Sequence, residues 1–314
     1  MHKRAIPAID AALTPRQGVT RLGQPMSYNR APACDLAPWI GRLYVTVVDL
    51  PDDYRLDCSL LNDVAVIRIQ LSGQWRAVTG DGVMEMGKSA LLFGPQMKAM
   101  PISVIGSFIS IGFAVRPGTG AALGWESTTN VIDRLFHLDD VGLPGSRLLD
   151  RLDEEGDAED WLSTIEEVIR AEVQQRNLPP PDPIASRFET LSYLDPNARI
   201  EEFAKDCGIG LRQLERIVLR DFGMSPKQVM RRARALDMGA HLRGVADQEE
   251  AEQIMLRYYD QSHLIRDFTK LFGMSPRQFV QRPLPLMTLT LENRQARRLE
   301  AIHRIEPGAA RPWE

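Results

Sequence analysis

The sequence predicts an α+β fold in which a β-rich N-terminal domain with trailing helices precedes an all-α C-terminal region. Short apolar segments separated by Gly-rich turns fill residues 43–115, which favours a small barrel or sandwich. After Arg116-Pro117-Gly118 the apolar residues recur at the spacing of helices. Four prolines within residues 177–183 stiffen the chain and forbid a helix, so we place the boundary between the two regions there.

The bulk composition is that of a globular protein. The chain has 314 residues, enough for two domains that each bury a core, and 44% of them are hydrophobic. The net charge is −4, so a surface that attracts nucleic acid must be a local feature. The three cysteines are far apart, which favours a reducing cytoplasm over a disulfide framework. No run of about 18 apolar residues exists, and residues 1–20 lack the apolar core of a signal peptide, so we expect no membrane association.

Alternating side chains identify strands in the N-terminal region. We expect strands at Leu43–Asp49, Val64–Leu71, Gln74–Thr79, Ser89–Phe93 and Ser107–Val115, with a hairpin turn at Gly80-Asp81-Gly82. Because successive strand residues point to opposite faces, the second of these strands has two distinct faces. One face carries Ala65, Ile67, Ile69 and Leu71, and the other carries Val64, Val66, Arg68 and Gln70. In the last strand, Ser110 and Gly112 lie opposite a face made of Ile109, Ile111, Phe113 and Val115.

Two helices are expected between these strands and the prolines, at Thr128–Leu138 and Asp160–Gln175. The second has an apolar stripe that we interpret as core packing, with a dimerisation surface as the alternative: Leu162, Ile165, Ile169 and Val173. The predicted division is a β-rich barrel domain over residues 20–176, a proline-rich linker over 177–183, a helical domain over 184–282 and a tail over 283–314. The tail contains one further expected helix, Thr290–Ile305.

The most specific feature of the sequence is an internal repeat. Phe222-Gly223-Met224-Ser225-Pro226 recurs 50 residues later as Phe272-Gly273-Met274-Ser275-Pro276. In each copy the glycine is placed to end a helix in the left-handed conformation, the serine to cap the next helix and the proline to occupy its first position. Gln228 and Gln278 then complete a capping box. Each copy therefore predicts a helix, a sharp corner and a second helix.

The residues before each corner complete a helix-turn-helix. In the first copy, Ile200–Cys207 is a short helix, Gly208-Ile209-Gly210 is the turn, and Leu211–Asp221 is the second helix, whose inward residues are Leu214, Ile217 and Val218. A long helix, Pro226–Arg243, follows the corner.

The second copy has the same parts. Glu250–Arg257 is its first helix, Tyr258-Tyr259 lies in the turn, and Asp260 caps the helix Gln261–Leu271. The inward residues of that helix are expected to be Leu264, Ile265, Phe268 and Leu271.

The outward faces of the two second helices carry side chains suited to DNA. Arg can pair bidentately with guanine and Gln with adenine, while Arg, Lys and Ser also hold phosphates. The candidate DNA-binding residues are Arg212, Gln213, Arg216 and Arg220 in the first unit and Gln261, Ser262, His263, Arg266 and Lys270 in the second. For His263, capping, packing and a phosphate contact stay equally open, whereas Asp267 is interpreted as an ion-pair partner.

Charge adds a weaker argument for the same region. Residues 195–282 contain 15 Lys and Arg against 13 Asp and Glu, so this region is net positive while the rest of the chain is net negative. Three further arginines of the long helix, Arg231, Arg232 and Arg234, are expected to add to the DNA-binding surface.

Residues 258–268, followed by Phe272-Gly273-Met274-Ser275-Pro276, are similar to the signature of the AraC/XylS family of transcription regulators. The resemblance covers residues 184–281. It implies two helix-turn-helix subdomains, joined by one long helix, whose recognition helices enter successive segments of the major groove. It also implies a cupin-like N-terminal domain that senses an effector or mediates dimerisation, a looser likeness that rests on Leu92-Phe93-Gly94-Pro95 and residues 109–118.

The resemblance also implies partners. We expect double-stranded DNA and RNA polymerase, together with a small-molecule effector and a second copy of the chain. Trp75, Phe113 and Trp125 could line a pocket in the sensing domain, but a simple core position is the preferred interpretation for each. No cofactor is expected.

The second unit departs from the family pattern in its first helix. Gln253 stands where a small residue is usual, and Arg257 replaces the turn glycine, so both changes are expected to cost stability. In the first unit, Gly210 stands where a serine cap is common, which costs only a few tenths of a kcal/mol. We therefore expect the first unit to be the more dependable DNA-binding unit.

Two other classes of function compete with a DNA-binding regulator. One is a regulator that acts through protein contacts and has weakened DNA binding. The other is a cupin-like enzyme, but its metal would need two or three histidines and a carboxylate inside the barrel. Only His2 and His137 lie in the N-terminal half, neither in an expected strand, and no nucleophile elbow, P-loop or dinucleotide fingerprint appears. The sequence therefore predicts a sequence-specific DNA-binding transcription regulator that is not an enzyme and has no metal site.

Overall fold

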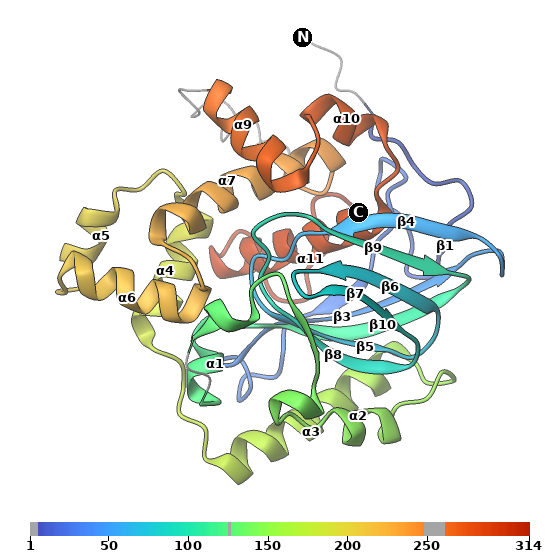
Figure 1. The fold of residues 1–314 in the computed structure, drawn as a ribbon, viewed down its shortest axis with the longest axis horizontal. Coiled ribbons are helices and arrows are strands. Elements are labelled where there is room, and N and C mark those ends of the chain that lie inside the picture. Colours follow the sequence, from blue (N-terminus) through green and yellow to red (C-terminus); the bar gives the residue numbers. More distant parts are fainter. Residues whose placement is uncertain (1–5, 125–126, 248–260) are drawn as a thin grey trace.

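The computed structural model describes residues 6–124, 127–247 and 261–314. It has the predicted α+β architecture, with the strands in the N-terminal half and the helices of the repeat in the C-terminal half (Figure 1). The strands are β1 (Thr14–Pro15), β2 (Tyr28–Arg30), β3 (Ile40–Asp49), β4 (Arg55–Leu60), β5 (Val66–Gln70), β6 (Gln74–Thr79), β7 (Gly82–Met86), β8 (Ser89–Phe93), β9 (Met100–Ile105), β10 (Phe108–Val115) and β11 (Leu135–His137).

The strands form two antiparallel sheets. The larger has the order β1-β3-β10-β5-β8-β11, with β2 also paired to β3, and the smaller has the order β4-β9-β6-β7. All five predicted strands are confirmed, and Thr79 pairs with Gly82 across the predicted hairpin turn. Strands β4, β7 and β9, which together make up most of the smaller sheet, were not predicted from the sequence.

The two faces of β5 lead to different environments. Ile67 and Ile69 belong to the hydrophobic core between the larger sheet and helix α3 (Ala158–Arg176), where Leu162 and Ile165 of the predicted stripe are also buried. The core-packing interpretation of that stripe is therefore confirmed. Arg68 and Gln70, on the other face of β5, point toward the smaller sheet and line a cavity.

The predicted helix Thr128–Leu138 is wrong. The structure has a short 3-10 helix, η1 (Thr128–Val131), followed by Asp133 at a φ of 55° and by β11, which pairs with β8. Tertiary hydrogen bonds hold this shape, because Asp133 accepts from the backbone of Met97 at 2.9 Å and donates its own N–H to Pro95 at 3.0 Å. His137 therefore lies in a strand, contrary to expectation.

Short helices connect the sheets to the C-terminal half. They are α1 (Thr119–Ala122), η2 (Asp139–Val141) and α2 (Gly145–Arg151), followed by α3. None of the helices in the described parts of the chain is long and apolar enough to span a membrane.

The helical half follows the repeat. Its helices are α4 (Pro183–Leu194), α5 (Ile200–Asp206), α6 (Leu211–Phe222), α7 (Pro226–Arg243), α9 (Gln261–Phe272), α10 (Pro276–Gln281) and α11 (Pro285–Ala301). Both predicted corners are confirmed: Gly223 and Gly273 have φ values of 72° and 69°, and Ser225 and Ser275 each form a capping box with the glutamine three residues on. The predicted helix Glu250–Arg257, its turn, Asp260 and the two departures at Gln253 and Arg257 lie outside the described residues.

Helix α11 begins five residues earlier than predicted, at Pro285, and is buried in the middle of the molecule (Figure 1). It contacts β3 and β4 on one side and α4 and α7 on the other. Leu286 and Leu289 join the core between the two sheets, whereas Met287 and Leu291 join the core around α7 and α9. Helix α11 therefore links the sheets to the helical repeat.

Candidate nucleic-acid interface

Helices α6 and α9 are equivalent elements of the repeat, and they bury equivalent side chains. The pairs that are offset by 50 residues and buried in both copies are Leu214 with Leu264, Val218 with Phe268, and Phe222 with Phe272. Because both helices bury the same face, both present the corresponding opposite face outward. Arg216 and Arg266 occupy the same position in the two helices, and both are exposed.

The outward face of α6 is basic at its N-terminal half. Arg212, Gln213 and Arg216 are exposed, and the two arginines lie one helical turn apart on one side of the helix. Gly210 is the N-cap and provides no side-chain cap. The first backbone N–H groups of a helix are suited to a phosphate, so this end combines positive side chains with free backbone donors.

On α9, the candidate residues Ser262, His263, Arg266 and Lys270 are exposed, and Gln261 begins the helix. Ile265 was predicted to face inward, but 45% of its surface is exposed. Asp267 takes the buried position instead and binds Arg231 of α7, which confirms the ion-pair interpretation of Asp267. In the first unit, the residue equivalent to Asp267 is the buried Ile217, so the second unit has an ion pair where the first has an apolar contact.

The remaining arginines near α6 and α7 contact protein groups. Arg220, a candidate DNA-binding residue, pairs with Asp221 at 2.6 Å and with Asp182 at 3.3 Å, and its hydrogen bond to Asp221 raises its pKa. Arg234 donates to the backbone carbonyl of Pro196 at 2.8 Å.

Arg232 was expected to face DNA, but it is buried at the junction with the sheets. It donates to the backbone carbonyls of Gln96 and Asp63. Burial lowers the pKa of Arg232 to about 10, so it stays a cation at neutral pH. Its expected role at the DNA surface is therefore wrong for this arrangement, and its observed role is to fasten α7 to the N-terminal half.

The N-terminal half of the chain holds both recognition helices by their C-terminal ends. Thr128 donates to the carbonyl of Asp221, the next-to-last residue of α6, at 3.1 Å. The backbone N–H of Ala99 donates to the carbonyl of Leu271, the next-to-last residue of α9, at 2.6 Å. In a helix-turn-helix, base edges are contacted mainly by the N-terminal part of the recognition helix. The attachments therefore leave the relevant ends of both helices exposed.

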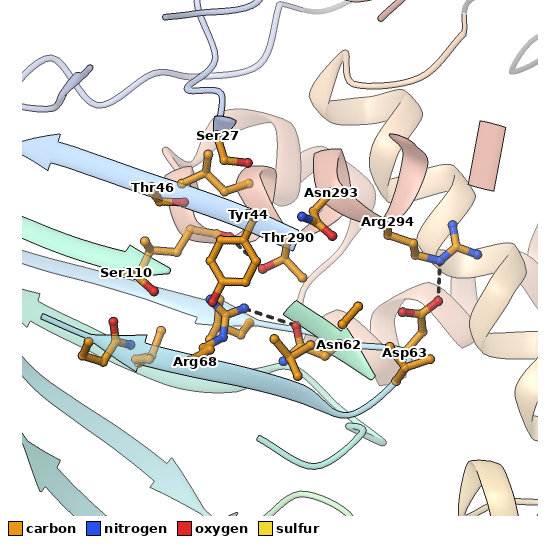
Figure 2. Close-up of a pocket in the computed structure, with 18 of the residues that line it drawn as sticks. Ser27, Tyr44, Thr46, Asn62, Asp63, Arg68, Ser110, Thr290, Asn293 and Arg294 are labelled. Atoms are coloured by element: carbon orange, nitrogen blue, oxygen red, sulfur yellow. Dashed lines mark hydrogen bonds and ion pairs between the residues drawn. The ribbon is translucent and has the colours of Figure 1, made fainter. Parts of the chain in front are cut away.

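A cavity between the two sheets and α11 is a second candidate site (Figure 2). It has an empty volume of about 690 Å³, counting the part that opens to solvent. The face of β5 opposite Ile67 and Ile69 lines it through Val66, Arg68 and Gln70. Thr290 and Asn293 of α11 face Arg68 and Tyr44 across it (Figure 2).

The aromatic residues considered for a pocket lie in different places. Trp75 lines this cavity and packs edge to face on Phe108, with 4.8 Å between the two ring centroids. Phe113 lies in the core between the larger sheet and α3, and Trp125 lies outside the described residues. The sequence predicted the tail helix that corresponds to α11 but not its place over this face, because alternation on β5 does not reveal which distant segment covers the strand.

Asp63, at the rim of the cavity, joins the two halves of the chain electrostatically. It accepts from Arg297 at 2.8 Å and from Arg294 at 3.0 Å, both on α11, and Arg294 also donates to Asp237 of α7 at 2.6 Å. Burial alone would raise the pKa of Asp63, but the attraction of Arg297, Arg294 and Arg232 lowers it to about 2. Burial disfavours the charged form of Arg294, but Asp237 and Asp63 outweigh that effect and raise its pKa.

Within the described residues, no group of three or more His, Cys, Asp or Glu side chains is arranged to hold a metal ion.

Comparisons with known proteins support the assignment of the helical repeat. A family model described as a helix-turn-helix domain matches residues 203–282, which include α6, α7, α9 and α10. A comparison with curated protein sequences found no match.

Among solved structures, the chain is similar to ToxT from Vibrio cholerae and to CuxR. ToxT of strain SCE256 bound to an unsaturated fatty acid is 14% identical, with a TM-score of 0.42 over 76% of this chain and 94% of that chain. ToxT of strain O395 bound to (E)-4-(8-methylnaphthalen-1-yl)but-3-enoic acid is 12% identical, with a TM-score of 0.44 over 76% of this chain and 98% of that chain. The AraC-like transcriptional activator CuxR is 12% identical, with a TM-score of 0.29 over 62% of this chain and 80% of that chain. Similarities this distant do not define a function.

The matched helix-turn-helix domain, in which α6 and α9 expose basic side chains, is that of a DNA-binding protein. The matched domain is of the AraC type, so the chain is a transcription regulator whose DNA-binding domain resembles that of the AraC/XylS family, as its sequence predicted.

Proposed function

We propose that this regulator recognises a specific DNA sequence through the N-terminal halves of α6 and α9. The observation that carries the proposal is the position of Arg212 and Arg216, which are exposed one turn apart on a helix whose other end is fixed to the N-terminal half. In a major groove, arginines at this spacing can reach guanine edges, and Gln213 beside them suits an adenine.

In the second unit we assign base or phosphate contacts to Gln261, Ser262, His263, Arg266 and Lys270. Arg266 is the equivalent of Arg216 and is therefore the strongest candidate for a base contact there. Arg220, whose guanidinium is held by Asp221 and Asp182, we now assign to the junction between the two halves rather than to DNA.

We further propose that the N-terminal domain senses a small molecule in the cavity between the sheets and α11. The support is the position of this cavity, because its wall is a helix that also contacts α7, the helix that joins the two units. By resemblance to AraC/XylS regulators, we also propose RNA polymerase and a second copy of the chain as partners.

The DNA contact is tested by single substitutions on α6. Arg212→Ala and Arg216→Ala should each weaken binding to the preferred DNA site by about 1–3 kcal/mol, because each removes a charged contact to a base edge or phosphate. The preferred site is first obtained by selecting genomic fragments with the purified full-length protein. Dissociation constants are then measured at several salt concentrations, and the affinity of the wild type should fall steeply with salt.

Arg55→Ala is the matched control for this test. Arg55 is an exposed arginine of β4 that pairs with Asp57, so the variant loses the same charge far from α6. The control should bind DNA like the wild type. Unchanged affinity in both α6 variants would contradict the role of this helix, and DNA binding with little salt dependence would favour a regulator that acts through protein contacts.

A further inference from the structure

Polar atoms without hydrogen-bond partners gather on the wall of the cavity. Among the described residues, buried side-chain atoms of this kind include Asn62 Nδ2, Arg68 Nε, Gln70 Oε1 and Asn293 Nδ2. All four residues line the cavity between the sheets and α11, and Asn62 and Gln70 are almost fully buried. A buried polar group without a partner costs free energy, so these atoms are suited to a ligand that completes their hydrogen bonds.

Arg68 gives the cavity a positive charge that the surrounding residues do not neutralise. Its guanidinium donates to the Tyr44 hydroxyl at 3.2 Å and to Asn62 Oδ1 at 3.4 Å, and it lies over the rings of Tyr44 and Phe93. In the part of the chain that the structure describes, no carboxylate forms an ion pair with Arg68. The two other arginines of the wall, Arg294 and Arg297, are both paired with Asp63.

We infer that this cavity binds a small organic anion, with a carboxylate as the charged group, and that α11 supplies part of the site. This inference rests on the proposed sensing role of the N-terminal domain and names the ligand class for it. The carboxylate oxygens accept from Arg68, Asn62 and Asn293, which together offer three donors. Gln70 Oε1 is an acceptor, which suits a hydroxyl group on the same ligand.

The rest of the lining defines the body of the ligand. Trp75 and Phe108 form one apolar wall, and Leu286 and Leu289 of α11 form another. An apolar body that packs between these walls contributes binding free energy in proportion to the area it buries. The site therefore favours a hydroxy acid with an aromatic or aliphatic body over a fully polar anion such as phosphate.

The participation of α11 gives the ligand a route to the DNA-binding half. Asn293 faces the cavity, and the next residue, Arg294, binds both Asp63 and Asp237 of α7. Movement of α11 toward a ligand thus acts on the ion pairs that hold α7. Because linkage is reciprocal, an anion that changes DNA affinity must have its own affinity changed by DNA to the same extent.

The test titrates the purified full-length protein with 3-phenyllactate and 6-hydroxyhexanoate, each beside its primary amide. Tryptophan fluorescence, to which Trp75 contributes, and thermal unfolding report binding. The acids should bind saturably, and the amides, which match them in shape but lack the charge, should bind at least about tenfold more weakly. Each acid is also titrated with DNA present to measure the linkage.

Variants place the binding in this cavity. Arg68→Gln and Asn293→Leu should each raise the dissociation constant of the acids by at least about tenfold, and Arg68→Lys, which keeps the cation, should retain the preference for acid over amide. Arg76→Gln is the matched control, because Arg76 lies on β6 next to Trp75 but outside the lining of the cavity. Thermal unfolding shows whether each variant is folded. If Arg68→Gln does not fold, the binding measured with Asn293→Leu decides the test.

The outcomes separate the inference from the proposed function. If neither acid binds, if the amides bind equally well, or if both Asn293→Leu and a folded Arg68→Gln bind the acids like the wild type, the anion site is wrong, whether or not the protein binds DNA. If the acids bind as expected but leave DNA affinity unchanged, the anion site is supported and the proposed sensing role fails.

Discussion

Single residues at the rim of the cavity hold buried charges together, and Asp63 is the central one. A buried carboxylate pays a large desolvation cost, which only close and well-oriented cations offset. Asp63 has two guanidinium partners on α11, and its backbone carbonyl accepts from Arg232 of α7. Removing this one carboxylate leaves several buried cations with fewer partners. We therefore expect its loss to destabilise both halves of the chain.

We expect Asp63→Asn to lower the free energy of unfolding by about 2–3 kcal/mol at pH 7. In the folded protein the pKa of Asp63 is about 2, which lies below the ~3.9 of an unfolded aspartate. The carboxylate therefore stabilises the fold above pH ~4, and this stabilisation is lost as the pH falls toward 2. Urea unfolding of the wild type and the variant over this pH range measures the effect, and the variant should lose stability less steeply.

Asp57→Asn is the control for this prediction. Asp57 pairs with Arg55 on the surface of β4, where both side chains are about half exposed or more, so its loss should change stability little. A pH profile of Asp63→Asn that parallels the wild type, or an equal loss of stability in Asp57→Asn, would show that the buried pairs do not act as described.

At the scale of elements, the corners of the repeat could be predicted because their physics is local. The left-handed glycine, the serine cap and the glutamine that completes the box lie within six residues, and no distant partner is needed. The same reasoning failed for Thr128–Leu138, because the shape of this segment depends on hydrogen bonds that Asp133 donates to Pro95 and accepts from Met97, both in another loop. Local pattern cannot report such partners, because tertiary contacts override helix propensity.

Gly94 shows how tightly that loop and the segment after η1 are joined. Its N–H donates to Arg134 at 3.0 Å, and a Cβ at position 94 would lie 1.6 Å from the carbonyl oxygen of Val131. Neither this Cβ nor the carbonyl oxygen of Val131 can move away without displacing backbone. We therefore expect Gly94→Ala to destabilise the protein by about 1–3 kcal/mol or more, as overpacking does, in urea unfolding.

Gly87→Ala tests whether the effect comes from this close approach. A Cβ at position 87, in the turn between β7 and β8, would meet no atom within 4 Å, and the residue has no left-handed backbone. The control should therefore be close to the wild type in stability. If Gly94→Ala is equally well tolerated, the segment 131–134 does not pack against β8 as the structure has it.

At the scale of the whole molecule, the sequence predicted faces but not what covers them. Alternation on β5 correctly separated Ile67 and Ile69 from Arg68 and Gln70, and the first pair is in the core. That the second pair lines a cavity depends on α11, whose Arg294 meets Asp63 across 231 residues of sequence. Likewise, the pattern of α6 predicted which of its faces is buried. The burial of Arg232 could not be predicted in this way, because it depends on the packing of the N-terminal half against α7.

Helix α11 lies outside the matched helix-turn-helix region, yet it contributes to both halves of the molecule. Leu291 of α11 is fully buried in the core around α7 and α9, while α11 itself packs on β3 and β4. We therefore expect Leu291→Ala, which should cost about 2–5 kcal/mol, to raise amide hydrogen exchange in both β4 and α7. Exchange followed by mass spectrometry resolves these two elements separately.

Leu162→Ala provides the comparison that makes this prediction specific. Leu162 is also a fully buried leucine, but it lies on α3 in the core against the larger sheet. Its replacement creates a similar cavity and a similar loss of stability, so general destabilisation is matched between the two variants. With Leu162→Ala the added exchange should stay within the N-terminal half, because local openings follow cooperative units of structure. If Leu291→Ala affected only β4 or only α7, α11 would belong to one half and would not couple the cavity to the DNA-binding helices.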